Sequence, residues 1–157
     1  MGKNINQQPT LDENELIKIR REKLQSFIEK GVEPFGARFE VKNHATEVRE
    51  EFGEIEGEVD AGEVTIAGRL MAIRGHGKAS FATLADKSGS IQIYFKLDVL
   101  GDEKYSEFKL LDIGDIIGVR GQVFKTKRGE LTVRVEDFKL LAKSLRPLPE
   151  KFHGLKD

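Results

Sequence analysis

Four side chains near the middle of the sequence have types that suit oligonucleotide binding. Phe81 offers a ring on which a base could stack, an interaction worth about 1–3 kcal/mol per base. The Gln92 amide donates and accepts at once, so it could read one base edge. Arg74 could reach a phosphate or a base. The Glu130 carboxylate could accept a hydrogen bond from an amine or imino N–H group of a base.

Further basic residues accompany these four. Lys125, Lys127 and Arg128 lie in the segment KTKRG and predict a loop that clamps phosphates. Lys78 belongs to residues 68–81, a basic stretch without any acid, and we count it as a further RNA contact. The formal net charge of -1 excludes a globally basic nucleic-acid coat, but it leaves room for such local basic segments.

Each of these residues also has an ordinary structural interpretation. Phe81 could be a core residue, and Gln92 could be a surface position of a strand. Glu130 could only form an ion pair with Arg128 or Arg134, and the basic loop could simply be solvated. Each signal alone is weak, so the argument depends on their joint placement on one face of a fold.

The residue types typical of catalysis and metal binding are absent or scattered. The chain has no cysteine, which excludes disulfides, cysteine zinc sites and thiol catalysis. The histidines, His44, His76 and His153, match no metal-ligand spacing, and there is no phosphate-binding loop or nucleophile elbow. We therefore find no basis for catalysis in these residues and expect no bound cofactor or metal.

Composition indicates one globular domain with a polar surface. The chain has 157 residues, of which 38% are hydrophobic and 34% are charged. Residues 1–60 carry 9 bases and 14 acids, whereas residues 61–157 carry 17 bases and 13 acids. No apolar run approaches the roughly 20 residues of a membrane span, and the N-terminus lacks the apolar region of a secretory signal. We expect a soluble cytoplasmic protein with no membrane partner.

The N-terminal part predicts a helical arm over residues 13–62. Residues 1–12 are polar without periodicity and predict a disordered tail. Helical spacing over 13–30 is capped by Asp12 and stopped by Gly31. Its apolar side is formed by Leu16, Ile17, Leu24, Phe27 and Ile28.

The same helix has a basic flank that could meet a polyanion. Arg21 lies on this flank with Lys18 and Lys23. Arg20 projects into the apolar sector of the helix. The alternative to an RNA contact at this position is an arginine that snorkels to solvent or forms an ion pair. We count Arg20 and Arg21 among the candidate RNA contacts. A second short helix is expected over 43–52 with Asn43 as its cap, followed by an acidic linker.

From residue 63 the hydrophobic period changes to two and predicts strands. We expect strands over 63–73, 79–86, 90–96, 116–124 and 130–141, with a helix over 102–112 and a flexible glycine loop at 75–77. In the 79–96 hairpin, one face carries Ala82, Leu84, Ile91 and Ile93, and the other carries Phe81, Thr83, Gln92 and Tyr94. We expect Tyr94 to pack within the sheet rather than stack on a base.

Five strands with one helix between the third and the fourth are typical of the OB-fold, a five-stranded Greek-key barrel. The fold class is therefore mainly β with helices, with the barrel over residues 63–142. Gly68, Gly118 and Gly121 suit the sharp coiling of such a small barrel. The face that carries Phe81 and Gln92 is the one with which OB-folds bind oligonucleotides.

Three segments resemble one protein family. They are VTIAGRLMAIRGHGKASFATLADKSGSIQIY, LGDIIGVRGQVFKTKRGELTV and LRPLPEKFHGLKD. They closely resemble bacterial class II lysyl-tRNA synthetases, and NELIKIRREKLQSFIEKGVEPFGARF is similar to the N-terminal arm of those enzymes. The resemblance covers about residues 13–157.

The resemblance implies that the barrel binds the anticodon stem-loop of tRNA(Lys). By this likeness Phe81 stacks on the central uridine, and Gln92 forms hydrogen bonds with an anticodon base. Arg74 holds the anticodon beside the following loop, and Glu130 helps to read the uridine-rich sequence. The basic flank of the first helix lies along the anticodon stem. Ile73 stands where some relatives have a second arginine, which implies a weaker phosphate contact.

The resemblance also implies a missing catalytic domain. The chain stops at Asp157, where that domain would begin, so residues 143–157 are expected to be a linker. Lysine activation with ATP and magnesium belongs to the parent enzyme, and the resemblance implies that this parent is a homodimer. No residue of the present chain is expected to be catalytic. Alternatives are a sequence-nonspecific single-strand binder, an interaction or oligomerisation domain using the 47–60 segment or the first helix, and an independent enzyme.

Overall fold

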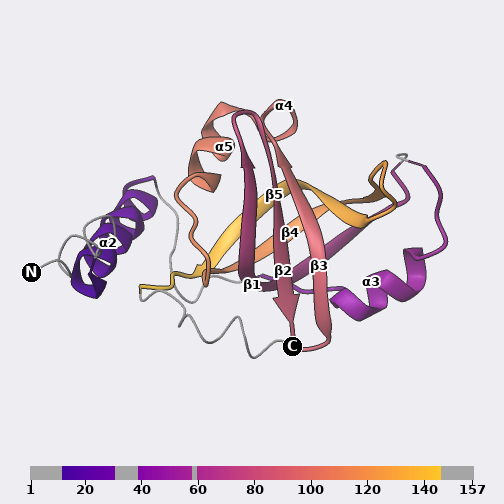
Figure 1. Ribbon diagram of the computed structural model, residues 1–157, viewed down its shortest axis with the longest axis horizontal. Helices are drawn as coiled ribbons and strands as arrows, with labels where there is room; N and C mark the ends of the chain where they lie inside the picture. Colours follow the sequence, from indigo (N-terminus) through magenta and orange to yellow (C-terminus); the bar gives the residue numbers. More distant parts are fainter. Residues whose placement is uncertain (1–11, 31–38, 58–59, 146–157) are drawn as a thin grey trace, which may run out of the picture.

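A barrel of five strands spans residues 62–142, with helices at its edges (Figure 1). The computed structural model describes residues 12–30, 39–57 and 60–145, so the predicted tail and most of the predicted C-terminal linker lie outside the described residues. The elements are α2 (Glu13–Glu29), α3 (Ala45–Phe52), β1 (Gly62–His76), β2 (Ala79–Asp86), β3 (Gly89–Lys96), α4 (Leu97–Leu100), α5 (Asp102–Phe108), β4 (Ile116–Lys125) and β5 (Leu131–Ala142). Within the described part of the chain, no helix is long and apolar enough to cross a membrane.

The strands close in the order β1-β2-β3-β5-β4. All neighbours are antiparallel except β3 and β5, which are parallel over a short junction where Gln92, Ile93 and Tyr94 face Thr132, Val133 and Arg134. A meander of three strands closed by a parallel pairing of the third and fifth strands is the OB-fold arrangement. The predicted fold class is confirmed.

Alternation in the β2–β3 hairpin separates the core from the outer face as predicted. Ala82 and Ile93 are fully buried, and Leu84 and Ile91 are nearly so. Phe81 and its outward neighbours are half-buried and face away from the barrel core. The hairpin therefore presents a mixed aromatic and polar surface on its outer side.

Two glycines of β4 lie where other parts of the chain approach the strand closely. A Cβ on Gly121 would collide with the backbone carbonyl of Arg134, next to a register shift between β4 and β5. A Cβ on Gly118 would collide with the ring of Phe39. These close approaches explain why the strand carries glycine at both positions.

The tip of the first hairpin differs from the expected flexible loop. β1 continues to His76, and Gly75 still pairs with Ser80, so the turn consists only of Gly77 and Lys78. Gly75 and Gly77 have φ angles of 98° and 76°. The prediction was wrong because a glycine in the left-handed region can stay inside a twisted ladder instead of ending it.

The expected helix over 102–112 is shorter and is preceded by another helical turn. α4 and α5 are separated by Gly101, whose φ of 90° breaks helical geometry. Beyond α5 the chain turns, and Leu111 is buried. The next residue, Asp112, accepts a hydrogen bond from Lys143 and belongs to a cluster of charged residues described below.

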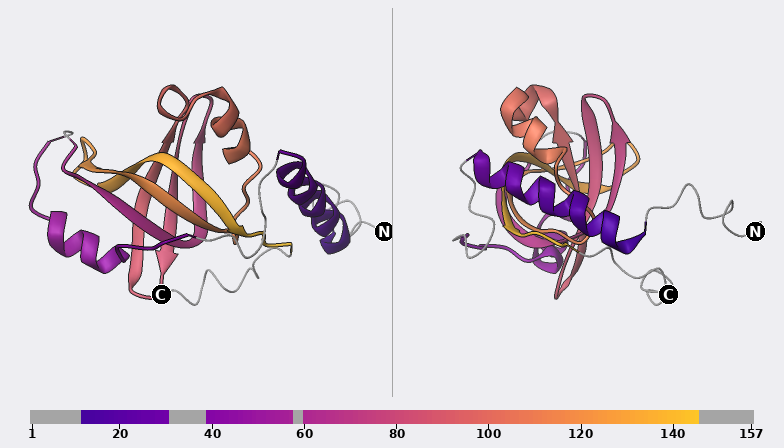
Figure 2. Two further views of the ribbon diagram at one scale, coloured as in Figure 1. Left: turned by 180° about the vertical axis from the view of Figure 1, so that it is seen from behind. Right: turned by 90° about the vertical axis from the view of Figure 1, so that its left-hand side faces the viewer.

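The helix α2 lies across one end of the barrel (Figures 1 and 2). Asp12 caps it as predicted, since its Oδ1 accepts from the Glu15 N–H at 2.8 Å. Phe27 is fully buried, but Ile28 is 45% exposed, contrary to the predicted apolar side. The predicted stop at Gly31 lies outside the described residues.

The helix α3 starts one residue later than expected, after His44. The predicted cap, Asn43, instead accepts a hydrogen bond from the Thr65 N–H through Oδ1 at 3.0 Å. The Glu47 carboxylate accepts from the His44 N–H at 2.9 Å. Asn43 thus fixes the chain to β1, a contact that local spacing does not reveal.

A buried charge cluster joins α2 to the barrel. The Lys143 ammonium, with no exposed side-chain surface, donates to Asp112 and Asp115 at 2.7 Å each. Lys23 of α2 donates to Asp112 at 2.8 Å. Burial raises the pKa of the Asp115 carboxyl. Burial acts in the same direction on Asp112, but hydrogen bonds from Lys143 and Lys23 outweigh it, so the pKa of Asp112 is lowered.

Replacing Lys143 tests this cluster. Lys143→Met should lower the free energy of unfolding at pH 7 by about 3–5 kcal/mol, because it leaves the buried Asp115 charge uncompensated. The pKa of Asp115 is raised in the folded protein, so above that pKa the buried carboxylate charge destabilises the folded state. This destabilisation is relieved when the carboxyl group becomes protonated as the pH falls through its pKa. The loss measured by urea denaturation should therefore shrink in acid. Lys96→Met, at an exposed position, should cost less than about 0.5 kcal/mol, and equal losses in the two variants would contradict the interpretation.

Candidate nucleic-acid interface

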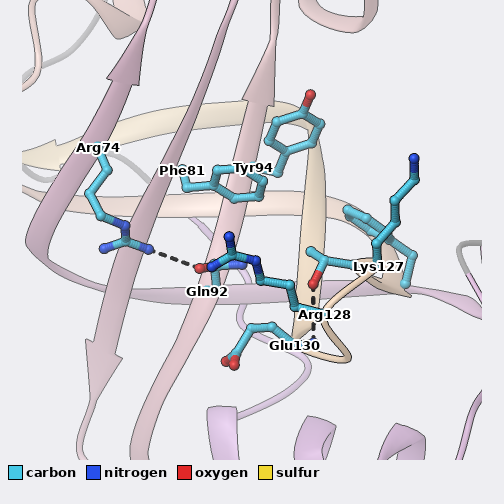
Figure 3. A pocket seen from close by; sticks show the side chains of 9 residues that line it. Arg74, Phe81, Gln92, Tyr94, Lys127, Arg128 and Glu130 are labelled. Carbon is cyan, nitrogen blue, oxygen red and sulfur yellow. Dashed lines mark hydrogen bonds between the residues drawn. The ribbon is translucent and has the colours of Figure 1, made fainter.

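A pocket of about 670 Å³ lies where the outer face of the β2–β3 hairpin meets the β4–β5 loop (Figure 3). It is lined by Arg74, Phe81, Gln92, Tyr94, Phe124, Thr126, Lys127, Arg128 and Glu130. The structure thus brings the ring, the amide, the arginine and the carboxylate proposed from the sequence to one place, together with two cations of the loop. We call this pocket the groove.

Aromatic rings form the floor of the groove. Phe81 and Tyr94 stack with centroids 4.6 Å apart and planes 25° apart. Phe124 is tilted against Tyr94 at 6.2 Å, and the Arg134 guanidinium lies 4.8 Å from the Phe124 ring centroid. Phe81 lines the groove and is not sealed in the barrel core, so the core interpretation of this residue is wrong. Tyr94 packs against Phe81 as expected and also lines the groove.

Hydrogen bonds fix the orientation of the Gln92 amide. Its Oε1 accepts from Arg74 Nη2 at 2.8 Å, and its Nε2 donates to the Thr132 hydroxyl at 3.0 Å. Thr132 in turn donates to the Glu130 carbonyl at 3.0 Å. An amide has two acceptor sites and two donors, so one of each stays available to a ligand. The oriented Gln92 can therefore still accept and donate on the groove side.

The β4–β5 loop is closed by its own hydrogen bonds. Thr126 N–H donates to the Glu130 carbonyl at 3.0 Å, and Gly129 N–H donates to the Thr126 carbonyl at 2.8 Å. The Thr126 hydroxyl accepts from the Glu130 N–H at 3.1 Å. The tight turn leaves Lys127 and Arg128 exposed, and in Figure 3 Arg128 is directed toward the middle of the groove while Lys127 is directed away from it.

The carboxylate of Glu130 is exposed at the rim. Among the residues that the structure describes, Glu130 forms no ion pair with Arg128 or Arg134. Arg134 instead pairs with Asp60 at 2.6 Å. The described contacts therefore do not support the interpretation of Glu130 as a partner of these arginines.

Four predicted RNA contacts do not line the groove. Lys125 donates to the Gly53 carbonyl at 2.8 Å, and Lys78 lies exposed at the hairpin turn. Arg20 donates to the carbonyls of Ile113 and Ser144 at 3.3 and 3.2 Å, which agrees with the structural alternative for it. Arg21 is exposed on α2 at the other end of the long axis from the β4–β5 loop (Figure 1).

Sequence reasoning missed several groove contributors. Phe124 and Thr126 line it, while Thr132 and Arg134 hold the residues that do. Phe124 ends a strand of period two beside the basic loop, which is the only signal in the sequence that could have indicated it. The Thr132 contact depends on the β3–β5 pairing and has no local signal.

The described ranges 12–30, 39–57 and 60–145 contain no group of three or more His, Cys, Asp or Glu side chains that could hold a metal ion. His44 lies beside Glu47, with Nδ1 and Oε1 3.3 Å apart. His153 lies outside the described residues.

Comparison with known proteins agrees with this geometry. Residues 64–141 match a tRNA anticodon family described as an OB-fold nucleic acid binding domain. The lysine–tRNA ligase of Moorella thermoacetica is 57% identical over 145 residues, covering 92% of this chain and 29% of that protein. The ligase of Syntrophomonas wolfei is 55% identical over 147 residues, covering 94% of this chain and 29% of that protein.

A ligase of Thermoanaerobacter pseudethanolicus is likewise 57% identical over 145 residues, or 92% of this chain and 28% of the ligase. Fold, groove and family match together define an OB-fold nucleic acid binding domain. Within that class, the chain belongs to the anticodon-binding domains of the bacterial lysine–tRNA ligase family. The chain spans less than a third of the length of the ligases that it matches.

The orientation of Gln92 can be tested by removing its partner. Thr132→Val removes the hydroxyl that accepts from Gln92 Nε2, so the amide should become mobile, and its side-chain resonances should sharpen and shift in NMR spectra. Loss of this buried hydroxyl should cost about 1–3 kcal/mol of folding free energy. The matched variant Thr65→Val, on β1, should leave the Gln92 resonances in place. Unchanged resonances in Thr132→Val would show that this contact does not orient the amide.

Proposed function

We propose that this domain recognises the uridine-rich anticodon of tRNA(Lys). The observation that carries the proposal is the convergence of Phe81, Gln92, Arg74 and Glu130 on one groove of an OB-fold barrel. The anticodon-binding family of the chain and the lysine–tRNA ligase names of its relatives support the same choice of ligand.

Stacking provides much of the binding energy in this mechanism. An extruded base lies on the half-buried Phe81 ring, which its stack with Tyr94 holds in place. Such a base–ring contact is worth about 1–3 kcal/mol and does not select a base by itself. Phe124, with Arg134 over its ring, extends the platform toward the β4–β5 loop and can receive a neighbouring base.

Selection comes from the polar groups beside the rings. A uracil edge presents a carbonyl acceptor next to an N–H donor. The remaining donor and acceptor of Gln92 match that pair, because Arg74 and Thr132 hold the amide in one orientation. Glu130 accepts from the N–H group of a neighbouring base at the rim. A cytosine edge presents an amino donor where uracil has the carbonyl acceptor, and a ring-nitrogen acceptor where uracil has the N–H donor. Both remaining groups of the fixed amide would then lack a complementary partner.

Phosphate contacts complete the interface. Lys127 and Arg128 lie exposed on the loop, and Arg74 lies on the opposite side of the groove (Figure 3). Lys78, exposed at the turn between β1 and β2, can extend this row of phosphate contacts along the β1–β2 hairpin. Arg21 on α2 remains a proposed contact with the anticodon stem, at a distance from the groove.

The parent protein supplies the chemistry in this proposal. It attaches lysine to tRNA with ATP and magnesium, in a catalytic domain and as a cytoplasmic homodimer, and we assign no catalytic step to the residues described here. Neither an independent enzyme nor an oligomerisation domain is favoured by any contact of the groove.

Removing the ring of Phe81 tests the stacking step. Phe81→Ala should weaken binding of a tRNA(Lys) anticodon stem-loop by about 1–3 kcal/mol in a fluorescence titration, because the base loses its platform. Phe81→Tyr keeps an aromatic ring and should bind close to the wild-type affinity. In amide NMR spectra the wild-type shifts should centre on the groove and be weaker with a mismatched loop. Equal affinity for both loops would select a sequence-nonspecific single-strand binder instead.

The dependence of binding on salt tests the phosphate contacts. If Arg74, Lys78, Lys127 and Arg128 each meet a phosphate, the plot of log K against log salt should have a slope of about −3, since each contact on a single strand contributes about −0.7. A flat plot would contradict an electrostatic partner. The titration should be repeated between about 50 and 200 mM salt, where such contacts dominate the change.

A further inference from the structure

The short helix α3 is attached at its N-terminus to the β2–β3 turn. Asp86 Oδ2 accepts from the Ala45 N–H at 2.9 Å, and Ser88 Oγ accepts from the Thr46 N–H at 3.0 Å. The Thr46 hydroxyl donates to the Ser88 carbonyl at 2.7 Å. Two of the free N–H groups at the start of the helix are therefore satisfied by a distant turn of the barrel.

The other end of α3 is attached to the β4–β5 loop. Gly53 follows the last helical residue, and its carbonyl accepts from the Lys125 ammonium at 2.8 Å. A cation at the carboxyl end of a helix is favourable for both the unpaired carbonyls and the helix dipole. Lys125 is the residue directly before the loop that bears Lys127 and Arg128, and unlike them it is only partly exposed.

Between its ends α3 is packed rigidly. Val48 is fully buried, and Phe52 lies against the barrel core. The Phe52 ring approaches Gly62 so closely that a Cβ there would lie 2.9 Å from it. In Figure 1 one end of the helix lies near the lower end of the β2–β3 hairpin, and the segment that follows its other end rises toward the β4–β5 loop.

We propose that α3 is a brace between the two walls of the groove and that Lys125 is a positioning residue rather than a phosphate contact. The β2–β3 turn fixes one end of the brace, and Lys125 transmits its position to the loop of residues 126–130. The distance between the Phe81–Gln92 face and the loop cations is then set by contacts outside the groove. The binding part of this inference rests on the proposed function.

The first test needs no RNA. Lys125→Met keeps the aliphatic stem but loses the bond to Gly53, so the Thr126, Gly129 and Glu130 amides, which close the loop, should exchange hydrogen faster. Lys125→Arg keeps a cation that can reach the same carbonyl and should restore slow exchange. Lys127→Met, whose side chain is exposed, should leave these rates unchanged. Equal rates in Lys125→Met and the wild-type protein would overturn the brace.

The second test separates positioning from direct contact. Lys125→Met should weaken binding of the anticodon stem-loop about tenfold without changing the salt slope, since no phosphate contact is lost. Lys127→Met should reduce the magnitude of the slope by about 0.7. A reduced slope in Lys125→Met would overturn the proposal and make Lys125 a phosphate contact.

The far end of the brace provides an independent variant. Asp86→Ala removes the carboxylate that accepts from the Ala45 N–H and, within the turn, from the Ser88 and Gly89 N–H groups, although Asp86 does not line the groove. It should also speed exchange of the loop amides, and its effect should not add to that of Lys125→Met. Additive effects would overturn the brace. Absence of wild-type RNA binding would contradict the proposed function alone, because the exchange measurements would still decide the role of Lys125.

Discussion

The short parallel junction between β3 and β5 is the contact on which the groove depends. Only three residue pairs form it, and two of them contain groove residues, Gln92 facing Thr132 and Tyr94 facing Arg134. A side-chain hydrogen bond from Gln92 to Thr132 reinforces this junction. Closure therefore does two things at once: it completes the barrel and brings the β4–β5 loop against the hairpin face. The same amide that joins the strands is the one proposed to read a base.

The fold and much of the groove could be predicted from the sequence because their signals are local. Period-two alternation separates Phe81 and Gln92 from Ala82 and Ile91 without knowledge of the barrel. The order of strands and helices favours one small barrel topology, whose binding face is known. The basic residues of KTKRG are predicted to lie in the loop between the last two strands, whichever residues end those strands. Topology then brings these pieces together, so their convergence follows once the barrel is assumed.

Three of the errors share a physical cause, which is that a polar side chain selects its partner in three dimensions. Lys125 and Lys127 are equivalent in sequence, yet the first reaches the end of α3 and the second stays exposed. Arg20 is a candidate RNA contact by sequence, although it projects into the apolar sector of its helix, and in the structure it donates to carbonyls of two distant segments. Asn43 likewise bonds to β1 instead of its own helix. No window of neighbouring residues contains these partners.

The stacked pair of Phe81 and Tyr94 also gives the chain an intrinsic optical probe. The protein has two tyrosines and no tryptophan, so tyrosine emission is not masked by a stronger fluorophore. Tyr105 is buried beside Phe108, away from the groove, and supplies a constant background. Tyr94 lies on the floor of the groove, where a base bound as proposed would quench its emission. Occupancy of the groove can thus be followed through native emission in unlabelled protein, without any change to the residues proposed to make the contact.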